Sequence, residues 1–274
     1  MDFDSLVKGV LNCGSEALTL QRGIARNHKH DGSIITEADH AVDALLISYI
    51  SESCPDAAII SEESEGTTPG TNGSWTFVID PIDGTDAYSQ GFPGWCIALG
   101  ILGADLQPVG AVIYAPRWSS FGEGETLLIL EPGKAAECNG RTLAREDYTG
   151  SISKRLQIMV SSRIHRIIDL SSFNGKIRTT GSAILHLVSP LLYREISASI
   201  QAPCYIWDMV AAHAILESQG YDLEYLSGGR PDYQKLIHRG KTPEVLLSGT
   251  YDDIDVLKGY ITSRDRKGLP RAHK

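Results

Sequence analysis

The sequence has no long apolar run. Nowhere in its 274 residues does a stretch approach the roughly 20 apolar residues that a bilayer-spanning helix needs. The chain opens with Met1-Asp-Phe-Asp4, which lacks the basic start of a secretory signal peptide. We therefore expect no membrane partner and a cytoplasmic location. With 42% hydrophobic residues, the chain can bury a substantial core in one large domain or two coupled ones.

Cysteine patterns that would bind zinc or form a disulfide framework are also lacking. The cysteines are odd in number, widely spread and without a Cys-x-x-Cys pair. They are Cys13, Cys54, Cys96, Cys138 and Cys204. This usage is typical of reduced, mostly buried thiols.

The chain has fewer basic than acidic residues. The chain has 25 Lys and Arg against 34 Asp and Glu, a net charge of -9. A protein whose main task is to bind a nucleic acid backbone needs the opposite balance, so nucleic acid is not the expected partner. An enzyme that binds cations, in contrast, uses several of its acidic residues for that purpose.

Motifs of several enzyme classes are incomplete. Residues 151–154 fit the Ser-x-x-Lys pattern of penicillin-binding enzymes, but the partner motifs of those enzymes are absent. Residues 240–242 end like a P-loop, yet Lys235 stands where the earlier glycine is required. There is no Gly-x-Ser-x-Gly elbow, and the eight histidines show no His-Glu-x-x-His spacing.

The chain does contain several acidic motifs, and the most informative is Asp-Pro-Ile-Asp-Gly-Thr at residues 80–85. It follows a strand-like run, so a strand is predicted to deliver Asp80 and Asp83 into a turn and a helix start. Both carboxylates can then reach one group of cations. The backbone N–H groups of Gly84 and Thr85 suit a phosphate oxygen. The alternative is an Asp N-cap followed by an ordinary turn.

Acidic residues also stand at the ends of other predicted elements. Glu62 and Glu63 follow an apolar run at residues 57–60 that is typical of a short buried strand. Asp208 opens an amphipathic stretch, so its carboxylate is expected at a helix N-terminus that faces the interior. Over residues 29–39, a polar loop that contains glycine leads into a further predicted helix.

In this order the segments resemble the lithium-sensitive, magnesium-dependent phosphatase superfamily of inositol monophosphatases, 3'(2'),5'-bisphosphate nucleotidases and fructose-1,6-bisphosphatases. The resemblance covers nearly the whole chain. Its motifs are the hexapeptide at residues 80–85, the acidic pair at 62–63, Trp-Asp at 207–208 and the Lys-x-Asp-x-Ser...Thr-x-x-Asp loop over 29–39. Gly-Ser-Ala at residues 181–183 matches a family segment near the organic part of the substrate.

The resemblance implies two or three bound Mg²⁺ ions, for which Mn²⁺ can substitute. Glu62, Asp80 and the Ile82 carbonyl would hold the first ion. Asp80, Asp83 and Asp208 would hold the second. A third ion would use Glu62 and water. Oxygen atoms of this kind are the ligands that Mg²⁺ prefers.

The implied catalytic groups lie beside these ligands. Thr85, hydrogen-bonded to Asp39, would take the proton from the attacking water. From the residues alone, Thr85 could instead cap its own helix and Asp39 could be a first-turn helix acid. Glu63 is either an acid that orients waters around the metals or a solvated neighbour of Glu62.

The implied substrate is a small phosphorylated metabolite, such as an inositol phosphate or a related sugar or nucleotide phosphate. Gly84 and Thr85 would bind its phosphate, and Ser182, Ala183 and Gln201 would contact the rest. Gln201 stands where inositol monophosphatases carry a glutamate for sugar hydroxyls, and an amide binds these less strongly. Since the polar loop over residues 29–33 resembles that of bisphosphate nucleotidases, activity of that type is the alternative.

The pattern along the chain predicts an α+β half, residues 1–150, that carries most metal ligands. An α/β half, residues 151–274, would add Asp208 and substrate contacts, and the resemblance implies one layered α-β-α-β-α sandwich of the sugar-phosphatase type. The predicted helices cover residues 3–21, 37–52 and 164–170 and start again at Ser182 and at Asp208. The predicted strands cover residues 96–102, 109–115, 126–130, 157–161 and 196–200. Residues 64–74 are expected to form a surface loop.

Two further properties follow from the resemblance alone: a homodimer and inhibition by Li⁺. Two other functions stay open. One is a non-catalytic regulatory protein on the same scaffold, and the other is a factor associated with nucleic acid. Phosphate release with Mg²⁺ would exclude the first, and absence of salt-sensitive RNA binding would exclude the second.

Overall fold

The computed structural model describes residues 1–23, 25–28, 34–64, 67–68, 75–119, 124–143, 156–238 and 240–263. The predicted polar loop at residues 29–33, most of the predicted surface loop at residues 64–74 and the Ser-x-x-Lys segment at 151–154 lie outside these ranges. Within them, no helix is both long and apolar enough to cross a bilayer.

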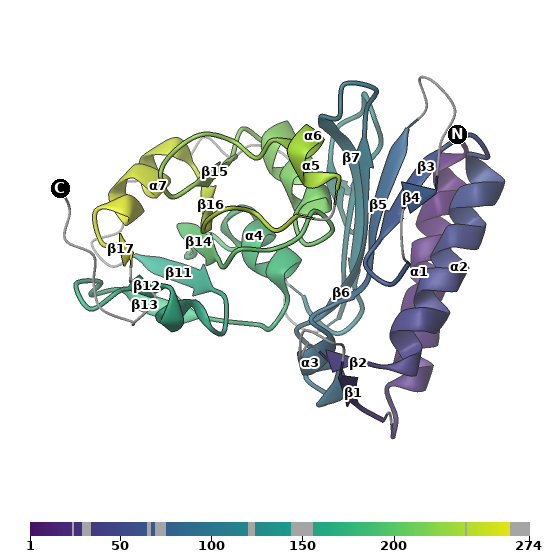
Figure 1. The fold of residues 1–274 in the computed structure, drawn as a ribbon, viewed down its shortest axis with the longest axis horizontal. Helices are drawn as coiled ribbons and strands as arrows, with labels where there is room; N and C mark the ends of the chain where they lie inside the picture. Colours follow the sequence, from purple (N-terminus) through teal and green to yellow (C-terminus); the bar gives the residue numbers. More distant parts are fainter. Residues whose placement is uncertain are drawn as a thin grey trace.

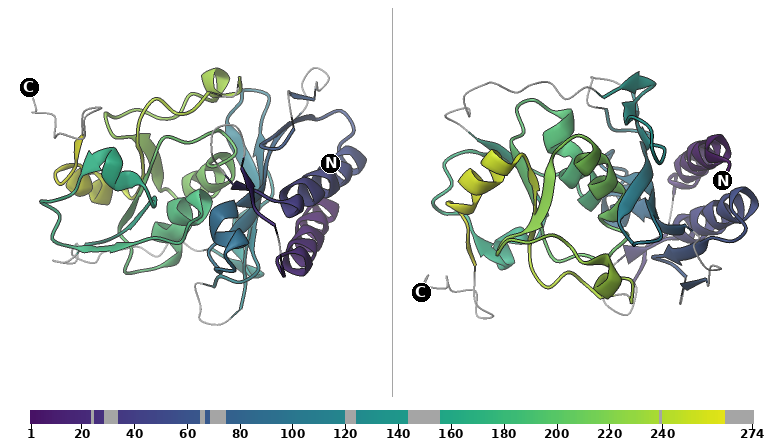
Figure 2. Two further views of the ribbon diagram at one scale, coloured as in Figure 1. Left: turned by 60° about the horizontal axis from the view of Figure 1, so that its bottom comes forward. Right: turned by 90° about the horizontal axis from the view of Figure 1, so that it is seen from above.

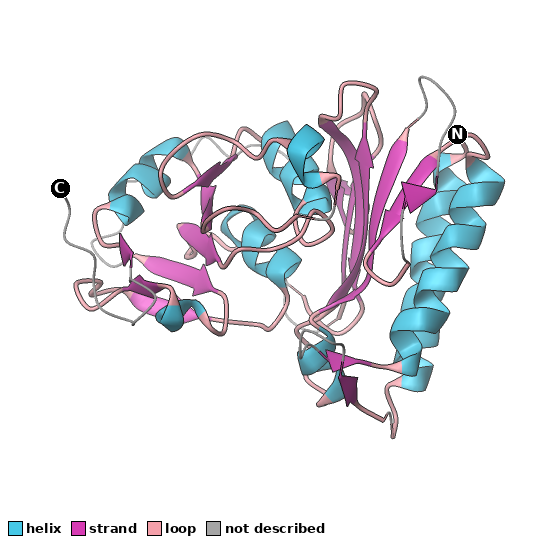
Figure 3. Ribbon diagram, in the orientation of Figure 1, coloured by secondary structure: helices cyan, strands magenta, loops and turns pink. Residues whose placement is uncertain are grey.

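Five layers alternate between helices and sheets (Figures 1 and 3). Helices α1 (Phe3–Leu20) and α2 (Glu37–Ser53) cover one face of an eight-stranded sheet. Helices α4 (Ala183–Leu192) and α5 (Val210–Ser218) cover its other face. A five-stranded sheet packs behind α4 and α5, and α7 (Tyr251–Lys258) lies on its outer face. The predicted layered sandwich is therefore confirmed.

The large sheet has the order β10-β9-β8-β7-β6-β5-β3-β4. Its strands are β3 (Ala58–Ser61), β4 (Thr67–Thr68), β5 (Thr76–Asp83), β6 (Cys96–Leu102), β7 (Pro108–Ala115), β8 (Thr126–Leu130), β9 (Glu137–Cys138) and β10 (Arg141–Thr142). Strands β5 to β8 form an antiparallel meander, whereas β3 pairs with β5 in parallel. This parallel pair brings the ends of β3 and β5 to one edge of the sheet, where both acidic motifs lie.

The small sheet has the order β13-β11-β14-β16-β15. Its strands are β11 (Gln157–Val160), β13 (Lys176–Arg178), β14 (Ala198–Gln201), β15 (Asp222–Tyr225) and β16 (Leu246–Gly249). The remaining elements are β1 (Asn27–His28), β2 (Ile34–Ile35), α3 (Thr85–Ser89), the 3-10 turn η1 (Ile164–Arg166), β12 (Ile168–Asp169), α6 (Tyr233–Leu236) and β17 (Thr262–Ser263). Figure 2 shows the same layers from two further sides.

Alternation along the strands distributes apolar side chains between the layers. Phe77 and Ile79 of β5 pack with α1 and α2, while Val78 packs on the side of α4 and α5. Leu246 of β16 likewise faces the central helices, and Leu247 belongs to the outer cluster with α7. Side chains in a strand point alternately to opposite faces, so each sheet contributes apolar side chains to a hydrophobic cluster on each of its two faces. The central helices α4 and α5 are consequently buried between two sheets.

The helix predicted over residues 164–170 is wrong. Only a 3-10 turn forms at Ile164–Arg166, after which Ile168–Asp169 pairs with Thr262–Ser263 of β17. The Asp169 carboxylate accepts the backbone N–H of Ser171 at 2.9 Å, which favours a turn at this point over a continued helix. The five cysteines are free, and all but Cys54 are buried, as predicted. The division at residue 150 stays a prediction.

Candidate active site

Three acidic side chains from two distant segments converge where strand β5 of the large sheet ends. The carboxylates of Asp80, Asp83 and Asp208 have oxygen atoms within 4.8 Å of one another. Asp80 and Asp83 lie in the last part of β5, which continues past the predicted end of the strand with a register shift between the two. Asp208 lies in the turn before α5, which begins at Val210. The expected proximity of Asp80 and Asp208 is therefore present.

Asp80 is buried among other carboxylates, which disfavours its charged form in the protein without a cation. Its side chain is 1% exposed, and no hydrogen-bond donor in the described ranges reaches its Oδ1 atom. Burial, and next the nearby carboxylates of Glu62 and Asp83, raise the pKa of Asp80 well above its usual value. A buried carboxylate oxygen without a donor is costly unless a cation binds it. The donor set of this cluster consists of hard oxygen atoms and so fits Mg²⁺ or a similar ion.

Asp83 is held by the start of α4. Its Oδ2 accepts hydrogen bonds from the Ser182 hydroxyl and, at 2.7 Å, from the Ile184 backbone N–H. Its Oδ1 accepts the Ala183 N–H at 3.1 Å. Burial raises the pKa of Asp83 to about 6, and the hydrogen bonds from Ser182 and Ile184 oppose that rise. The structure thus places polar groups of Ser182 and Ala183, both predicted to contact substrate, against a predicted metal ligand; their contact with substrate stays a prediction.

Asp208 is oriented by its own turn. Its Oδ2 accepts the backbone N–H of Tyr205 at 2.6 Å. Burial, followed by the charges of Asp83 and Glu62, raises the pKa of Asp208 well above its usual value, and Lys241 partly opposes the rise. Lys241 also lies 4.7 Å from the centre of the Tyr205 ring. The sequence does not indicate this role of Lys241. The incomplete P-loop pattern around it would indicate a lysine that binds phosphate, not one that lies near Asp208 and Tyr205.

Glu62 and Glu63 occupy the turn after β3. The N–H of Glu62 donates to the Ile79 carbonyl at 3.3 Å, which ties this turn to β5. The Glu62 charge contributes to the raised pKa values of Asp80 and Asp208, so its carboxylate belongs to the same electrostatic group. Glu62 is not one of the three residues within 4.8 Å of one another. Glu63 is partly buried beside it, and both interpretations of its role stay open.

Thr85 and Asp39 form the predicted hydrogen bond. The Thr85 hydroxyl lies 3.0 Å from Asp39 Oδ1 and 2.9 Å from the Ile82 carbonyl, so its single proton has two acceptors. Asp39 Oδ2 accepts the N–H of Thr36 at 2.8 Å and the Thr36 hydroxyl at 2.6 Å. Asp39 therefore also acts at the start of α2, as the alternative interpretation has it. The two roles use different oxygen atoms.

Gly84 connects β5 to α3 in a left-handed conformation, with φ of 94°. A Cβ atom at this position would lie 3.1 Å from the Gly94 carbonyl oxygen and 3.3 Å from the Ser182 Cα. Glycine adopts this conformation without steric cost. The close approach fixes the Thr85 backbone beside the start of α4, where the predicted phosphate site lies.

Gln201 ends β14 and is buried. Its Oε1 accepts the Ser161 hydroxyl at 2.7 Å. Its side chain also favours the charged form of His186, although burial dominates and lowers the pKa of that histidine to about 4. The amide of Gln201 is thus engaged within the protein, and its predicted substrate contact stays a prediction.

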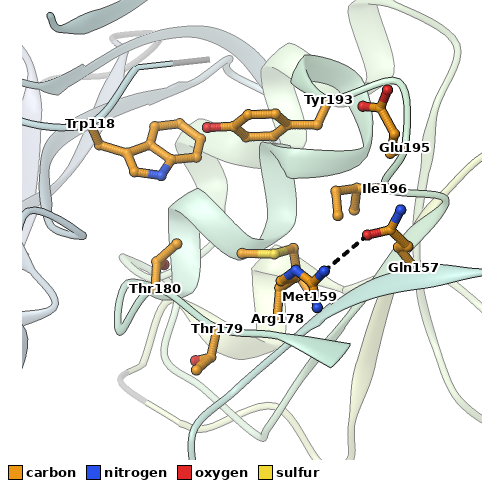
Figure 4. A pocket seen from close by; sticks show the side chains of 9 residues that line it. All are labelled: Trp118, Gln157, Met159, Arg178, Thr179, Thr180, Tyr193, Glu195 and Ile196. Carbon is orange, nitrogen blue, oxygen red and sulfur yellow. Dashed lines mark hydrogen bonds between the residues drawn. The ribbon is translucent and has the colours of Figure 1, made fainter. Parts of the chain in front are cut away.

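A cavity of about 390 Å³ opens beside the small sheet (Figure 4). Its lining comprises Trp118, Gln157, Met159, Arg178, Thr179, Thr180, Tyr193, Glu195 and Ile196. None of the predicted site residues lines it. Its Thr180 wall connects to the acidic cluster through Ser182, whose N–H donates to the Thr180 hydroxyl at 3.3 Å and whose own hydroxyl donates to Asp83. The predicted chemistry therefore belongs to the acidic cluster and not to this cavity.

The sequence is similar to a known protein family and to several of its members. A model of the inositol monophosphatase family matches residues 6–252. The chain is 26% identical over 228 residues to the inositol-1-monophosphatase of Synechocystis sp., covering 78% of this chain and 75% of the relative. It is 25% identical over 212 residues to the histidinol-phosphatase of Mycobacterium tuberculosis, covering 73% and 77% of the two chains.

Comparison of structures agrees at the level of the fold. The crystal structure of the extragenic suppressor protein suhB from Bartonella henselae superposes with a TM-score of 0.75 and 19% identity. The match covers 94% of this chain and 97% of that one. At this identity the likeness shows a shared fold.

Proposed function

Since the chain belongs to the inositol monophosphatase family, a family of phosphatases, we propose that it is a metal-dependent phosphomonoesterase acting on a small phosphorylated metabolite. One observation carries this proposal: three acids converge within 4.8 Å beside a threonine that is hydrogen-bonded to an aspartate, and one of these acids has a buried oxygen that no donor among the described residues reaches. Such an arrangement is costly for the protein alone and suits a cation and a polarised water.

The family resemblance implies which residues would hold Mg²⁺, and the convergence of Asp80, Asp83 and Asp208 supports part of this set. Glu62, Asp80 and the Ile82 carbonyl would hold one ion, and Asp80, Asp83 and Asp208 a second. A third would use Glu62 and water, and Mn²⁺ can replace Mg²⁺. When bound, the ions supply positive charge to the phosphate ester and lower the pKa of a coordinated water.

The protein groups move the proton and hold the ester. The Thr85 hydroxyl oxygen would take the proton of the attacking water while the hydroxyl passes its own proton to Asp39 Oδ1, 3.0 Å away. The backbone N–H groups of Gly84 and Thr85 hold a phosphate oxygen. The three donors from the start of α4 keep Asp83, which would hold a metal ion, in one orientation.

The substrate class is a small phosphate monoester, and its identity is a question of specificity. One relative is named for inositol 1-phosphate chemistry and another for histidinol phosphate. Gln201 at the position of a family glutamate argues against strict dedication to inositol phosphates. Nucleotidase-type activity on 3'(2'),5'-bisphosphates is the alternative.

A panel of phosphate esters tests the proposal. Inositol phosphates, adenosine 3',5'-bisphosphate, fructose 1,6-bisphosphate, histidinol phosphate and glycerol phosphates are compared by kcat/KM with Mg²⁺. We expect release of phosphate from at least one ester and loss of turnover on chelation or in Asp208→Asn. A folded protein that releases no phosphate from any of them, with Mg²⁺ or Mn²⁺, would instead support the non-catalytic regulatory protein.

Three further properties are proposed, the first two of them from the family. The first is a homodimer, which the family resemblance implies. Light scattering of the purified protein measures its mass directly. Li⁺ is expected to inhibit turnover at limiting Mg²⁺, and unchanged rates would contradict this. A cytoplasmic location is the third property, and fractionation of cells tests it.

A further inference from the structure

Asp43 binds both serines that flank the acidic pair. Asp43 lies on α2, is 7% exposed, and accepts a hydrogen bond from the Ser61 hydroxyl on Oδ1. Its Oδ2 accepts the Ser64 hydroxyl at 2.8 Å. The Ser61 hydroxyl oxygen in turn accepts the backbone N–H of Glu63 at 3.3 Å. A single buried carboxylate therefore holds both ends of the turn that carries Glu62 and Glu63.

Helix α2 carries both Asp43, which holds the turn with Glu62 and Glu63, and Asp39, which is hydrogen-bonded to Thr85. Asp39 and Asp43 are one helical turn apart, so they lie on the same face of α2. Asp39 contacts Thr85, and Asp43 contacts Ser61 and Ser64. One rigid helix thus sets the distance between the group that moves the proton and the turn that carries a metal ligand. Hydrogen bonds to a charged acceptor are stronger and more directional than neutral ones.

We propose that Asp43 is a positioning residue, which orients the Glu62 carboxylate toward the metal through Ser61 and Ser64. This inference rests on the proposed metal-dependent function. Groups that orient a metal ligand from behind commonly change metal affinity by about 10- to 100-fold when they are mutated. Asp43 itself does not belong to the cluster of Asp80, Asp83 and Asp208.

Direct binding of Mn²⁺ tests the proposal without relying on turnover. The metal-free protein is titrated with Mn²⁺, and free Mn²⁺ is measured by electron paramagnetic resonance. Asp43→Asn is expected to weaken binding by about 10- to 100-fold, and Ser64→Ala by about tenfold. Ser64→Ala is the decisive variant, because it removes a hydrogen bond and leaves the net charge unchanged.

Two matched controls separate positioning from charge and from fold. Asp255→Asn removes one exposed negative charge on α7, and Ser48→Ala removes an exposed serine hydroxyl on α2. Both are expected to bind Mn²⁺ like the wild type. At saturating Mn²⁺, the KM for the ester is expected to be unchanged in Ser64→Ala, and kcat to recover to within a few fold. A purely structural role of Asp43 would lower the Tm of the variants and leave their Mn²⁺ affinity unchanged.

The outcomes are distinguishable. If Asp43→Asn and Ser64→Ala bind Mn²⁺ with wild-type affinity, the positioning role is refuted and the proposed phosphatase function survives. If the folded wild-type protein binds no Mn²⁺ at all, the proposed function and this inference fall together. Should Asp43→Asn fail to fold, Ser64→Ala still decides the question, since it changes only one half-buried hydroxyl.

Discussion

At the scale of single residues, the Thr85 hydroxyl has a choice between two acceptors. It can donate to Asp39 at 3.0 Å or to the Ile82 carbonyl at 2.9 Å. Proton transfer requires the first geometry, whereas the second is an ordinary helix-start contact. Since a single proton cannot serve both at once, the charge on Asp39 should favour the productive one.

We predict that Thr85→Ala lowers kcat by at least about a hundredfold, the scale of a lost proton-transfer group. Thr85→Ser keeps the hydroxyl and should retain most activity. The measurement is phosphate release with the best ester of the panel at saturating Mg²⁺. Circular dichroism of each variant controls for folding. Wild-type turnover in Thr85→Ala would show that the hydroxyl only stabilises the helix start.

Asp80 illustrates a conflict between stability and function. Its carboxylate is buried, receives no hydrogen bond at Oδ1 from the part of the chain that the structure describes, and faces other acids. We predict that Asp80→Asn stabilises the metal-free protein at pH 8 by about 1–2 kcal/mol, seen as a Tm higher by roughly 2–8 °C. The same variant should lose the stabilisation by Mn²⁺ and the phosphatase activity. A lower Tm in the absence of metal would mean that the carboxylate is well solvated or paired.

At the scale of elements, the connection between β5 and α3 depends on one glycine. Gly84 has a positive φ of 94°, and a Cβ there would lie 3.1 Å from a carbonyl oxygen. We predict that Gly84→Ala costs about 1–3 kcal/mol of unfolding free energy and lowers kcat more than it raises KM, because it displaces Thr85. Chemical denaturation and steady-state kinetics measure the two effects. Gly133→Ala, also at positive φ but with no atom within 4 Å of the added Cβ, is the matched control for backbone strain.

Elements with a strong pattern are predictable from the sequence. Helices α1 and α2 and strands β6 and β8 match their predicted bounds to within a residue or two, because the helices show an apolar pattern of helical spacing and the strands are continuous apolar runs. Strand β13 has only three residues and all are exposed, so its sequence is too short to indicate a strand. The error at residues 164–170 has the same origin, since the pairing partner β17 lies almost a hundred residues away.

The site divides in the same way. Asp80, Asp83, Thr85 and Asp208 stand in short motifs, and the family resemblance that these motifs carry implies that they converge. Asp43 has no such motif, because its role depends on packing between α2 and the turn after β3. Contacts of that kind are set by tertiary structure, and a single sequence does not reveal them.

At the scale of the whole molecule, the acidic cluster links stability to both pH and metal. Burial raises the pKa of Asp83 to about 6, and those of Asp80 and Asp208 are raised as well. A carboxyl group with a raised pKa stabilises the fold below its unfolded-state pKa, and that contribution is lost as the pH rises through the folded-state value. The metal-free protein should therefore lose stability from this cluster as the pH rises through about 6.

Buried histidines act in the opposite direction. Burial lowers the pKa of His186 and of His213 to about 4. These groups are neutral in the fold, so their contribution is lost as the pH falls from about 6.5 toward 4. A stability curve of the metal-free protein alone would mix the two effects. Because the histidines are the same with and without metal, their contribution largely cancels in the difference between the two curves.

We predict that the rise in Tm produced by a fixed excess of Mn²⁺ increases between pH 5 and pH 7.5. The metal binds deprotonated carboxylates, so protons compete with it wherever the raised pKa values keep the cluster protonated. A hundredfold excess over the dissociation constant is worth about 2.7 kcal/mol, which thermal unfolding resolves easily. Asp208→Asn should flatten the dependence. A Tm difference that stays constant across this range would mean that Mn²⁺ binds away from Asp80, Asp83 and Asp208, and the proposed metal centre would have to be abandoned.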